Sequence, residues 1–500
     1  MTPALIQSLK AARRVSVPIV AITTPDPAAT IKAIVELNGG PMLQWDAAEG
    51  LRSLNDAGKD TRAAIISEVD PTIANPFALL QLAKKLPPKS VLFVHLANRW
   101  VADPMTVQAA WNLRDEFKRD QRMLVLLAID CHWPAELSGD IVVLDEPLPD
   151  AAALERIIRR VHQEALLELG EADRVIEAVQ GLPAFQAEQV VAMSLTKQGV
   201  DVPALWERKR KQIELTPGLK VCRETSMFKD IGGVAVVKDF LGRIMAGQSR
   251  PNAVVFVDEI EKFLAGASGG AADSSGVSQD QLGQLLSYMQ DNNAAGCIFV
   301  GPPGAAKSAV AKAAGNEANI PTIQLDLGGM KGSLVGQSEQ SLRSALKVVT
   351  SVSNGRSLWI ATCNSISDLP PELRRRFTLG TFFFELPDNA ERRAIWNIWT
   401  DRYDAFDPTK KARHKDIQIP DDEGWTGAEI RQCCDIAWRL GCTLKEAAAF
   451  VVPVSKSAAE QLEKLRRAAD GRFLSASKPG VYRREQEPSR TTEKRRLELE

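Results

Sequence analysis

Eight consecutive residues combine the features of a phosphate-binding loop. They are Gly301, Pro302, Pro303, Gly304, Ala305, Ala306, Lys307 and Ser308. Glycines let consecutive backbone N–H groups point into one concavity, and a helix that follows adds the positive end of its dipole. Lys307 would reach the β- and γ-phosphates of a nucleotide, and the Ser308 hydroxyl would bind Mg²⁺. The alternative is a loop that binds no nucleotide, or binds one without turnover.

One position of this loop departs from the usual pattern. The residue before the lysine is normally glycine, and here it is Ala306. If the backbone there has a positive φ, alanine strains it by about 1 kcal/mol or more, because its Cβ approaches a neighbouring carbonyl. If the backbone is in the right-handed helical region, alanine is harmless. The sequence leaves both conformations open.

Two acidic residues, Asp258 and Glu259, follow the apolar run 254–257. Four apolar residues ahead of two acids fit a buried parallel strand whose carboxyl end opens at a ligand crevice. Asp258 would hold the Mg²⁺ water shell, and Glu259 would polarise an attacking water. Two solvated acids at a strand end are the alternative. In ordinary P-loop ATPases the phosphate loop precedes this acidic strand, whereas here it follows.

A polar amide and a run of arginines follow the next apolar strand. Asn364 ends the run 358–363 and could orient the attacking water. Arg375 and Arg376 follow Arg374 and are candidates for an arginine finger that reaches the γ-phosphate held by a neighbouring subunit. A solvated basic cluster is the alternative reading of these arginines.

The elements that must position these residues alternate between strand and helix patterns. That alternation predicts an α/β fold with parallel sheets. The expected strands of the second block, residues 228–387, are 253–257, 297–300, 322–325, 358–362 and 381–385. A helical lid is expected at 388–452. The first block, residues 1–205, has expected strands at 18–22, 42–45, 90–94, 123–127 and 141–144.

The first block is interpreted as a degenerate copy of the second. The segment 141–150 parallels 382–388, and both lead into a helix. After the first strand, residues 23–27 contain neither a glycine-rich run nor a lysine, so no phosphate loop is expected there. Chance likeness between α/β domains is the alternative. Residues 206–227 are expected to form a linker, and 453–500 a charged tail that is disordered after a helix at 458–469.

The motifs together resemble the AAA family of ATPases. The resemblance covers about residues 228–445 and rests on 228–233, 301–308, 364–376 and 426–430. It implies that Asp230, Ile231 and Gly232 lie along the adenine of ATP, and that Gly427 and Ala428 in the lid also touch the nucleotide. Within the family, the chain is similar to a plastid, cyanobacterial and phage branch with an N-terminal α/β domain.

The resemblance also implies a ring, expected to be a hexamer, that remodels a protein partner. The segment 336–339 is similar to the family's pore-loop segment, where an aromatic residue normally contacts a threaded polypeptide. The matching place here is 334–335, with 330–331 nearby, and it contains no aromatic residue. The spacing between the last two arginines is also shorter here than in the family's arginine-finger pattern.

The family's sheet gives the swapped motifs a defined place. Its spatial order would put the expected strands in the order 381–385, 297–300, 358–362, 253–257, 322–325. After each strand the chain moves toward the same side of the sheet as it does in the usual strand order. Right-handed connections therefore keep every helix on its usual face of the sheet. This rewired order predicts Asp258 and Glu259 beside Lys307 and Ser308, with Asn364 on the strand between them.

Composition restricts the remaining possibilities. The formal net charge of the 500 residues is −1, so no global field attracts nucleic acid or a membrane surface. No apolar run approaches the roughly 20 residues of a membrane span, and the 7 cysteines favour a reducing, cytoplasmic setting. We expect a Mg²⁺-dependent ATPase. The alternatives are a nucleotide-gated assembly module without hydrolysis and a DNA-associated ATPase, for which 374–376 and 464–467 offer basic clusters.

Overall fold

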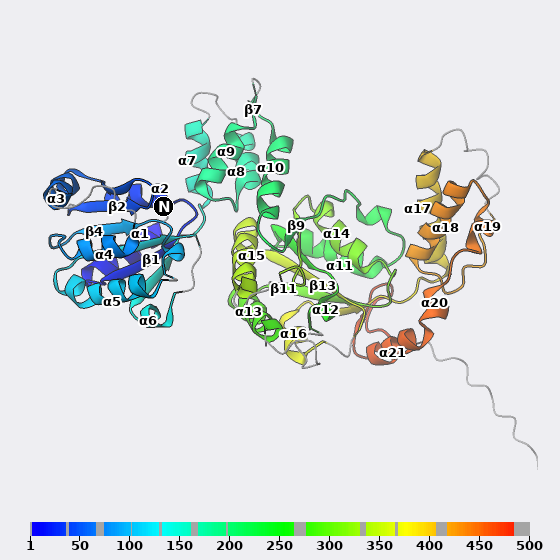
Figure 1. Cartoon of the computed structure of the whole chain (residues 1–500). Helices are drawn as coiled ribbons and strands as arrows, with labels where there is room; N and C mark the ends of the chain where they lie inside the picture. The colour runs from blue at the N-terminus through cyan, green and yellow to red at the C-terminus, as the bar shows by residue number, and fades with distance from the viewer. Residues whose placement is uncertain are drawn as a thin grey trace, which may run out of the picture. The chain divides into compact units, whose positions relative to one another are not determined.

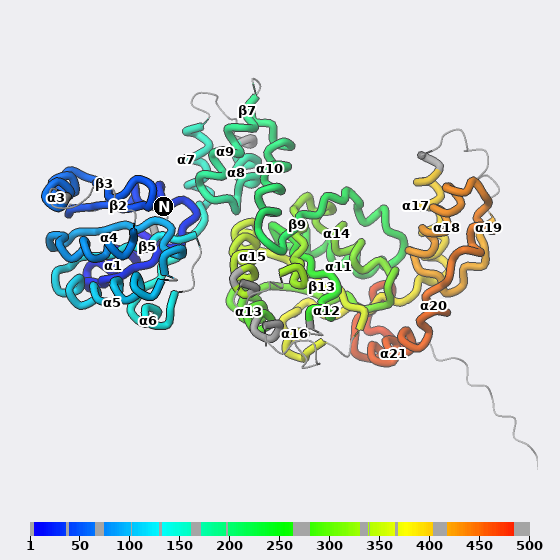
Figure 2. Tube along the Cα trace, viewed as in Figure 1, coloured from blue at the N-terminus to red at the C-terminus, as the bar shows by residue number. Residues whose placement is uncertain are grey.

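A computed structural model describes most of the chain, which divides into two compact units. The described residues are 3–36, 40–66, 75–101, 103–129, 133–161, 169–196, 199–264, 277–330, 337–365, 369–406 and 418–484. The first unit comprises residues 1–209 and the second 210–500, so the division falls within helix α10 (Val202–Glu214). Figures 1 and 2 show both units along the chain.

The first unit contains a six-stranded sheet. Its spatial order is β3-β2-β4-β5-β1-β6. The strands are β1 (Ile19–Thr23), β2 (Met42–Asp46), β3 (Gly50–Ser53), β4 (Val91–Val94), β5 (Met123–Ala128) and β6 (Ile141–Asp145). Neighbours pair in parallel except for the β2–β3 hairpin. The five strands expected from the sequence are confirmed, and the short β3 was missed.

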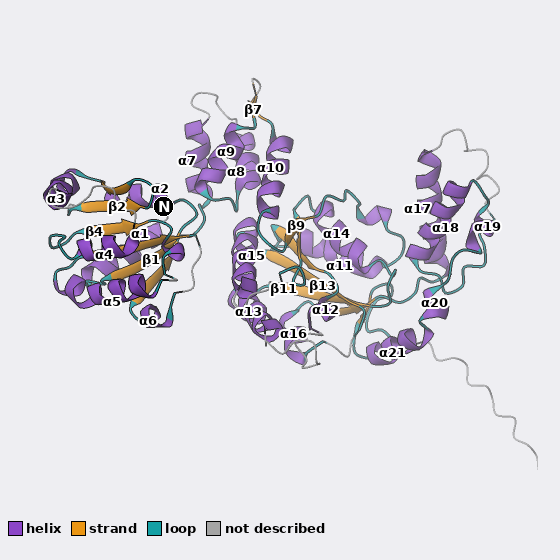
Figure 3. Cartoon of the chain, in the orientation of Figure 1, coloured by secondary structure: helices purple, strands orange, loops and turns teal. Residues whose placement is uncertain are grey.

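Helices cover both faces of this sheet (Figure 3). They are α1 (Pro3–Arg14), α2 (Pro27–Val35), α3 (Asp56–Ile66), α4 (Pro76–Ala83), η1 (Ala97–Arg99), α5 (Pro104–Arg119) and α6 (Ala135–Ser138). Side chains of α1 and α2 form the core on one face, and those of α4 and α5 form it on the other. The strands are therefore apolar along their whole length, as in sheets buried on both sides.

A helical bundle completes the first unit. It contains α7 (Ala151–Val161), α8 (Leu169–Val179), α9 (Ala184–Ala192) and α10, with the two-stranded ribbon of β7 (Leu195–Thr196) and β8 (Gly199–Val200). Its apolar core includes Leu154, Val175, Val191 and Leu205.

The second unit contains a seven-stranded sheet. Its order is β15-β14-β11-β13-β10-β12-β9. The strands are β9 (Leu219–Val221), β10 (Ala253–Val257), β11 (Ala295–Val300), β12 (Thr322–Leu325), β13 (Ser357–Cys363), β14 (Thr381–Phe383) and β15 (Leu474–Ser475). All pairs are parallel except β12–β9. The five central strands stand in the order predicted for the swapped motifs, so the rewired P-loop sheet is confirmed.

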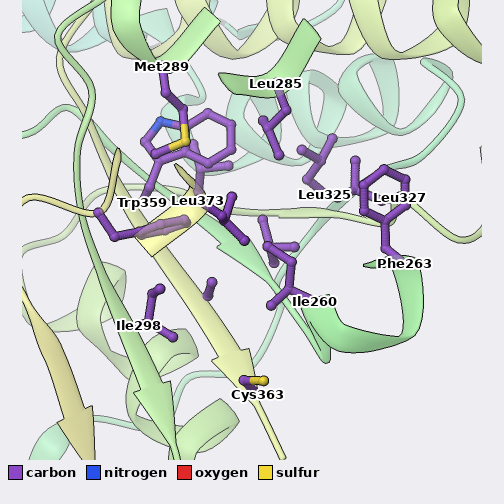
Figure 4. Close-up of a cluster of buried hydrophobic side chains, with 14 of the residues drawn as sticks. Ile260, Phe263, Leu285, Met289, Ile298, Leu325, Leu327, Trp359, Cys363 and Leu373 are labelled. Carbon is purple, nitrogen blue, oxygen red and sulfur yellow. The ribbon is translucent and has the colours of Figure 1, made fainter. Parts of the chain in front are cut away.

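Helices on both faces bury the central strands of the second sheet. The helices of the sheet are η2 (Phe228–Asp230), α11 (Ala235–Ala246), α12 (Ile260–Leu264), α13 (Val277–Asp291), α14 (Lys307–Glu317), α15 (Gln337–Ser353) and α16 (Pro371–Arg376). Along β10, Val255 and Val257 pack into one core and Val254 and Phe256 into the other. Figure 4 shows the first core, where α12 and α13 meet the strands.

A helical lid and a C-terminal segment follow β14. The lid contains α17 (Asn389–Phe406), α18 (Gly427–Leu440) and α19 (Leu444–Ala448). Trp396, Trp425, Ile430 and Cys433 are among its buried core residues. The chain returns to the sheet through α20 (Val454–Ser457), α21 (Ala459–Ala469) and β15. No helix in the described part of the chain has the length and apolar character needed to cross a membrane.

The two sheets share one arrangement. The order β6-β1-β5-β4-β2 in the first unit corresponds to β14-β11-β13-β10-β12 in the second. The chain visits the first sheet in the usual order and the second in the rewired order. Even a backbone detail recurs, because Leu96 after β4 and Glu259 after β10 both have positive φ, 51° and 48°. This likeness supports the interpretation of the first unit as a degenerate copy.

The first unit lacks the segment that could hold phosphates in this position. Only residues 24–26 connect β1 to α2, whereas 301–306 connect β11 to α14. Thr30 on α2 donates a hydrogen bond to Glu146, which follows β6. The short connection and this contact close the place that corresponds to the phosphate loop.

The expected disorder of the C-terminal tail is wrong for residues 470–484. Phe473 and Tyr482 are buried, and β15 pairs with β14. Glu385 accepts hydrogen bonds from Arg466 at 2.7 Å and from the Tyr482 hydroxyl at 2.6 Å. Two aromatic anchors and the hydrogen bond from Tyr482 to Glu385 thus hold a segment whose composition is polar. Residues 485–500 and 265–276 lie outside the described residues, as do 331–336, which include the place expected for the pore-loop aromatic at 334–335.

Candidate nucleotide-binding site

A cavity of about 910 Å³ opens at the carboxyl ends of the strands in the second unit. The lining residues that the sequence had singled out come from five separate segments: Asp230, Ile231 and Gly232; Asp258 and Glu259; Pro303 to Ser308; Asn364; and Gly427 and Ala428. Its size lies within the range of small-molecule sites. The fold therefore brings most of the candidate residues to one place.

Two glycines of the loop are required by close contacts. A Cβ added to Gly301 would lie 2.3 Å from the carbonyl oxygen of Phe384, and one added to Gly304 would lie 2.7 Å from Oγ1 of Thr426. Gly304 also has a φ of 81°. Gly301 itself does not line the cavity; it sets the loop against the strand that leads to the lid.

Ala306 adopts the conformation that favours glycine. Its φ is 66° and its ψ is 9°, and it is the residue directly before helix α14. A left-handed alanine costs about 1 kcal/mol or more relative to glycine. The sequence left open whether the backbone here is left-handed or right-handed, and the structure shows the strained, left-handed conformation.

Lys307 is almost fully buried, at 6% exposure, and bonds to its own loop. Its Nζ donates to the carbonyl oxygens of Gly301 at 2.7 Å and Pro302 at 2.6 Å. Burial lowers the pKa of Lys307 to about 8, while the nearby carboxylates, Glu261 first, act in the opposite direction. Phosphate oxygens would replace the carbonyl partners and compensate the buried charge.

Ser308 and Asp258 meet although they come from motifs in swapped order. The Ser308 hydroxyl donates to Oδ1 of Asp258 at 2.9 Å, and the Thr362 hydroxyl donates to the same oxygen at 2.6 Å. Hydroxyl and carboxylate oxygens are the hard ligands that Mg²⁺ takes in nucleotide sites, with phosphates completing its coordination. The donor set therefore fits Mg²⁺. Elsewhere in the described chain, no group of three His, Cys, Asp or Glu side chains forms a metal site.

Glu259 is held by one residue at the end of β13 and by one residue just after that strand. Its backbone N–H donates to Oγ1 of Thr362 at 2.9 Å, and its Oε1 accepts from Nδ2 of Asn364 at 3.2 Å. Lys262 forms an ion pair with the same carboxylate. The side chain thus has a fixed direction at the edge of the cavity, as a residue that polarises water requires.

Glu261 was missed by the sequence analysis. Only 9% of it is exposed, and its Oε1 accepts the backbone N–H of Asn364 at 3.0 Å. Burial raises the pKa of the neighbouring Cys363 thiol, and the Glu261 carboxylate raises it further. In the sequence, Glu261 is a charged residue in a short helix, which normally predicts a solvated side chain; no signal marked it as buried.

The lid closes the cavity opposite the loop. A Cβ on Gly232 would lie 2.5 Å from Cγ1 of Ile395, and one on Gly427 would lie 3.7 Å from its Cδ1. Helix α18 begins with a capping box in which Thr426 and Glu429 bond reciprocally. These contacts place the entry segment and the lid helix around one apolar side chain, where an adenine would lie.

The outer part of the lid wall consists of residues that the sequence analysis did not select. They are Trp399, Arg402 and Tyr403 on α17, and Arg431, Asp435 and Trp438 on α18. Both guanidinium groups lie over the Trp399 ring, at 5.3 Å for Arg402 and 5.1 Å for Arg431. Their helical spacing, three to four residues apart, was the available signal.

Arg375 and Arg376 do not line this cavity. They end helix α16, where Arg375 is exposed and Arg376 donates to Oε1 of Gln290 at 2.7 Å. The structure therefore does not bring them together with the other candidate residues.

Family comparisons agree with both units. Residues 5–146 match the model of the SpoVK-like AAA ATPase N-terminal domain, and residues 297–354 match that of the ATPase family associated with various cellular activities (AAA). The second match runs from β11 into the end of α15. It leaves out β10, which precedes the loop in this chain.

Curated relatives extend the likeness over most of the chain. Three proteins named "Uncharacterized AAA domain-containing protein ycf46" are similar to it. The protein of Guillardia theta is 24% identical over 457 residues, 80% of this chain and 79% of that protein. Those of Pyropia yezoensis and Gracilaria tenuistipitata var. liui are 22% identical over 499 residues (88% and 92%) and 23% over 375 (65% and 70%). Within the matched residues the chain is therefore similar to AAA ATPases and to their SpoVK-like N-terminal domain, and over most of its length it is similar to the ycf46 proteins.

Proposed function

We propose that the chain binds and hydrolyses ATP with Mg²⁺ in the cavity of the second unit. The similarity to AAA ATPases supports ATPase activity in general terms. The observation that carries the specific proposal is the hydrogen bond between Ser308 and Asp258, since it brings the proposed Mg²⁺ ligands of the two motifs together. Mg²⁺ would neutralise phosphate charge as the transition state develops.

Each residue of the site has a role in this proposal. Lys307 and the loop amides bind the phosphates, Ser308 and Asp258 hold Mg²⁺, Glu259 polarises water, and Asn364 orients it. The entry segment 230–232 and the lid residues 427–428 bind the adenosine. Catalysis then consists of positioning and charge stabilisation, as in other phosphoryl-transfer sites.

We further propose that the chain acts as a ring, with six subunits expected, and that hydrolysis remodels a protein partner. The position of Arg375 and Arg376 outside their own cavity supports a finger that acts on a neighbouring subunit. The near-zero net charge gives nucleic acid no comparable support.

A second candidate is a nucleotide-gated assembly module that does not hydrolyse ATP. The strained Ala306 favours it, because the loop that holds the phosphates starts from an unfavourable conformation. Tight ATP binding without phosphate release would distinguish this candidate from an ATPase.

Native mass spectrometry and phosphate release, both with and without ATP, test the proposal together. We expect an ATP-dependent ring and turnover in the wild-type chain. Lys307→Ala should lose ATP binding and the ATP-dependent ring. The matched control Lys312→Ala removes a lysine about one and a half turns further along α14 that pairs with Glu224, and should keep both properties. Turnover unchanged in Lys307→Ala would refute the assignment of the site.

A further inference from the structure

Strand β6 forms an edge of the first sheet and exposes apolar side chains. It pairs with β1 on one side, and no described strand pairs with it on the other. Val142 and Val143 are 38% and 51% exposed. Helix α1 contacts β6, and helix α3 packs against the opposite edge strand, β3. Exposed apolar edges are unusual, because proteins normally protect them from pairing with other chains.

The backbone of β6 presents hydrogen-bonding groups to this open side. Glu146 donates its N–H to the carbonyl oxygen of Thr23 at 2.9 Å, so residue 146 faces β1. Because direction alternates along a strand, Val142 and Leu144 also face β1. Ile141 and Val143 therefore turn their N–H and C=O groups outward.

The corresponding edge of the second sheet is covered. Strand β14 lies beside β11 as β6 lies beside β1, and its outer side pairs in parallel with β15. Phe382 faces Leu474 and Phe383 faces Ser475 in this pair, and Ala476 donates its N–H to the carbonyl oxygen of Phe383 at 3.0 Å. Phe382 and Phe383 are 2% and 0% exposed.

The pairing registers show which residue of β6 corresponds to which residue of β14. Thr23 ends β1 opposite Asp145, and Val300 ends β11 opposite Phe383. Leu144 therefore corresponds to Phe382, and Val143 to Thr381. This edge of the sheet is thus paired with a two-residue parallel strand in the second unit, whereas no described strand pairs with it in the first.

We propose that the open edge of β6 binds a short extended segment of a protein partner, which adds to the sheet as a parallel strand. Main-chain hydrogen bonds to Ile141 and Val143 would supply affinity, and apolar side chains of the segment would cover Val142 and Val143. The orientation follows from β15. A second copy of this chain is the less favoured occupant, since two β6 edges related by a two-fold axis would pair antiparallel. This surface is separate from the nucleotide cavity, so the proposal does not depend on the function proposed above.

Random peptides displayed on phage and selected on the whole chain test this proposal. The affinity of the selected peptides, after synthesis, is measured by fluorescence anisotropy for wild-type and variant chains. Val143→Pro removes one outward N–H, which β1 does not use, and proline is tolerated on strand edges. We expect it to weaken binding about tenfold or more. Val143→Thr keeps both the N–H and the branched side chain, and should bind like the wild type.

Two additional measurements make the result decisive. Val143→Lys leaves the backbone unchanged and adds a charge to the edge, so it should also weaken binding if Val143→Pro proves unfolded by circular dichroism. Hydrogen exchange should show the Val143 amide protected only when peptide is bound. Failure to select any peptide whose binding Val143→Pro or Val143→Lys weakens would overturn the proposal. Sedimentation showing that the wild-type chain dimerises through this edge would overturn it in favour of a second copy.

Discussion

Asn364 donates its side-chain amide to Oε1 of Glu259 at 3.2 Å, although the two residues follow different strands and lie far apart in the chain. The contact exists because β13 and β10 are parallel neighbours whose carboxyl ends meet at one edge of the sheet. The amide thereby fixes the carboxylate that would polarise water, and could orient the same water itself.

Removal of this amide should slow hydrolysis more than it weakens binding. We expect Asn364→Ala to lower kcat by about a hundredfold, in the range of a positioned catalytic group, with KM little changed. Steady-state phosphate release at several ATP concentrations separates the two constants. Asn112→Ala, an exposed substitution in the first unit, should match the wild type. A large rise in KM with an unchanged kcat would mean that Asn364 binds ATP and does not orient the water.

Replacement of the strained alanine should stabilise the protein. At a φ of 66°, Ala306→Gly should raise the free energy of unfolding by up to about 1 kcal/mol. Ala309→Gly, in the first turns of α14, should lower it by about 0.5 to 1 kcal/mol, because glycine weakens a helix. Chemical denaturation monitored at the second unit measures both. If the two substitutions changed the free energy of unfolding in the same direction, the left-handed conformation of Ala306 would be contradicted.

The buried carboxylate of Glu261 should act through Asn364. Glu261→Gln keeps an oxygen that can accept the Asn364 N–H, so turnover should stay near the wild-type value. Glu261→Ala leaves that buried N–H without its partner, at a cost of about 1 to 3 kcal/mol, and should lower kcat with Asn364 displaced. Turnover and thermal unfolding of the two variants should therefore differ. If both variants lose turnover equally, the charge of Glu261 matters and the hydrogen bond does not; if both match the wild type, Glu261 has no role in turnover.

Complementation between inactive variants tests the proposed arginine finger. Arg375→Ala with Arg376→Ala should abolish turnover while ATP binding persists, since neither residue lines its own cavity. Mixed with Lys307→Ala chains, this variant should regain part of its activity, because a Lys307→Ala subunit still offers its arginines to a neighbour. Gln290→Ala removes only the contact of Arg376 and serves as the control. Mixtures that remain inactive, although mass spectrometry shows mixed rings, would exclude action between subunits.

The pKa of Lys307 predicts how ATP affinity depends on pH. Burial lowers this pKa to about 8 in the free protein, so the ammonium is mostly charged at pH 7 and mostly neutral at pH 9. Only the charged form pairs with phosphate, and the dissociation constant of ATP should therefore rise about tenfold over this range. Calorimetric titration at several pH values measures it. Lys307→Arg stays protonated throughout and should lose this dependence; the same dependence in both proteins would assign it to another group.

The sequence predicted the central strands because they are buried on both faces. An apolar run such as that of β10 is typical of a strand that is buried on both faces. The handedness of the connections between strands then predicted which strands lie beside it. Strands β9 and β15 were missed because segments of three and two residues carry no periodic pattern. They pair only because the completed sheet offers them an edge.

The roles of side chains could be predicted where a sequence motif specifies them. They could not be predicted where the role depends on how deeply the fold buries the residue. The loop residues and the acidic pair follow from the chemistry of phosphate binding. Glu261 resembles any charged helical residue until the fold buries it, and the conformation of Ala306 depends on how the loop meets α14. Composition likewise indicated a disordered tail, whereas Phe473 and Tyr482 anchor its first part in the core of the second unit.

The most direct test of the account is ATP occupancy and turnover in Glu259→Gln. We propose that the swapped motifs form one hydrolytic site, in which Glu259 is needed for water activation but not for ATP binding. Rapid filtration with labelled ATP should therefore recover about one unhydrolysed ATP per chain from this variant, while the wild-type chain releases phosphate. Turnover by Glu259→Gln at the wild-type rate, or no ATP binding by either protein, would contradict the account.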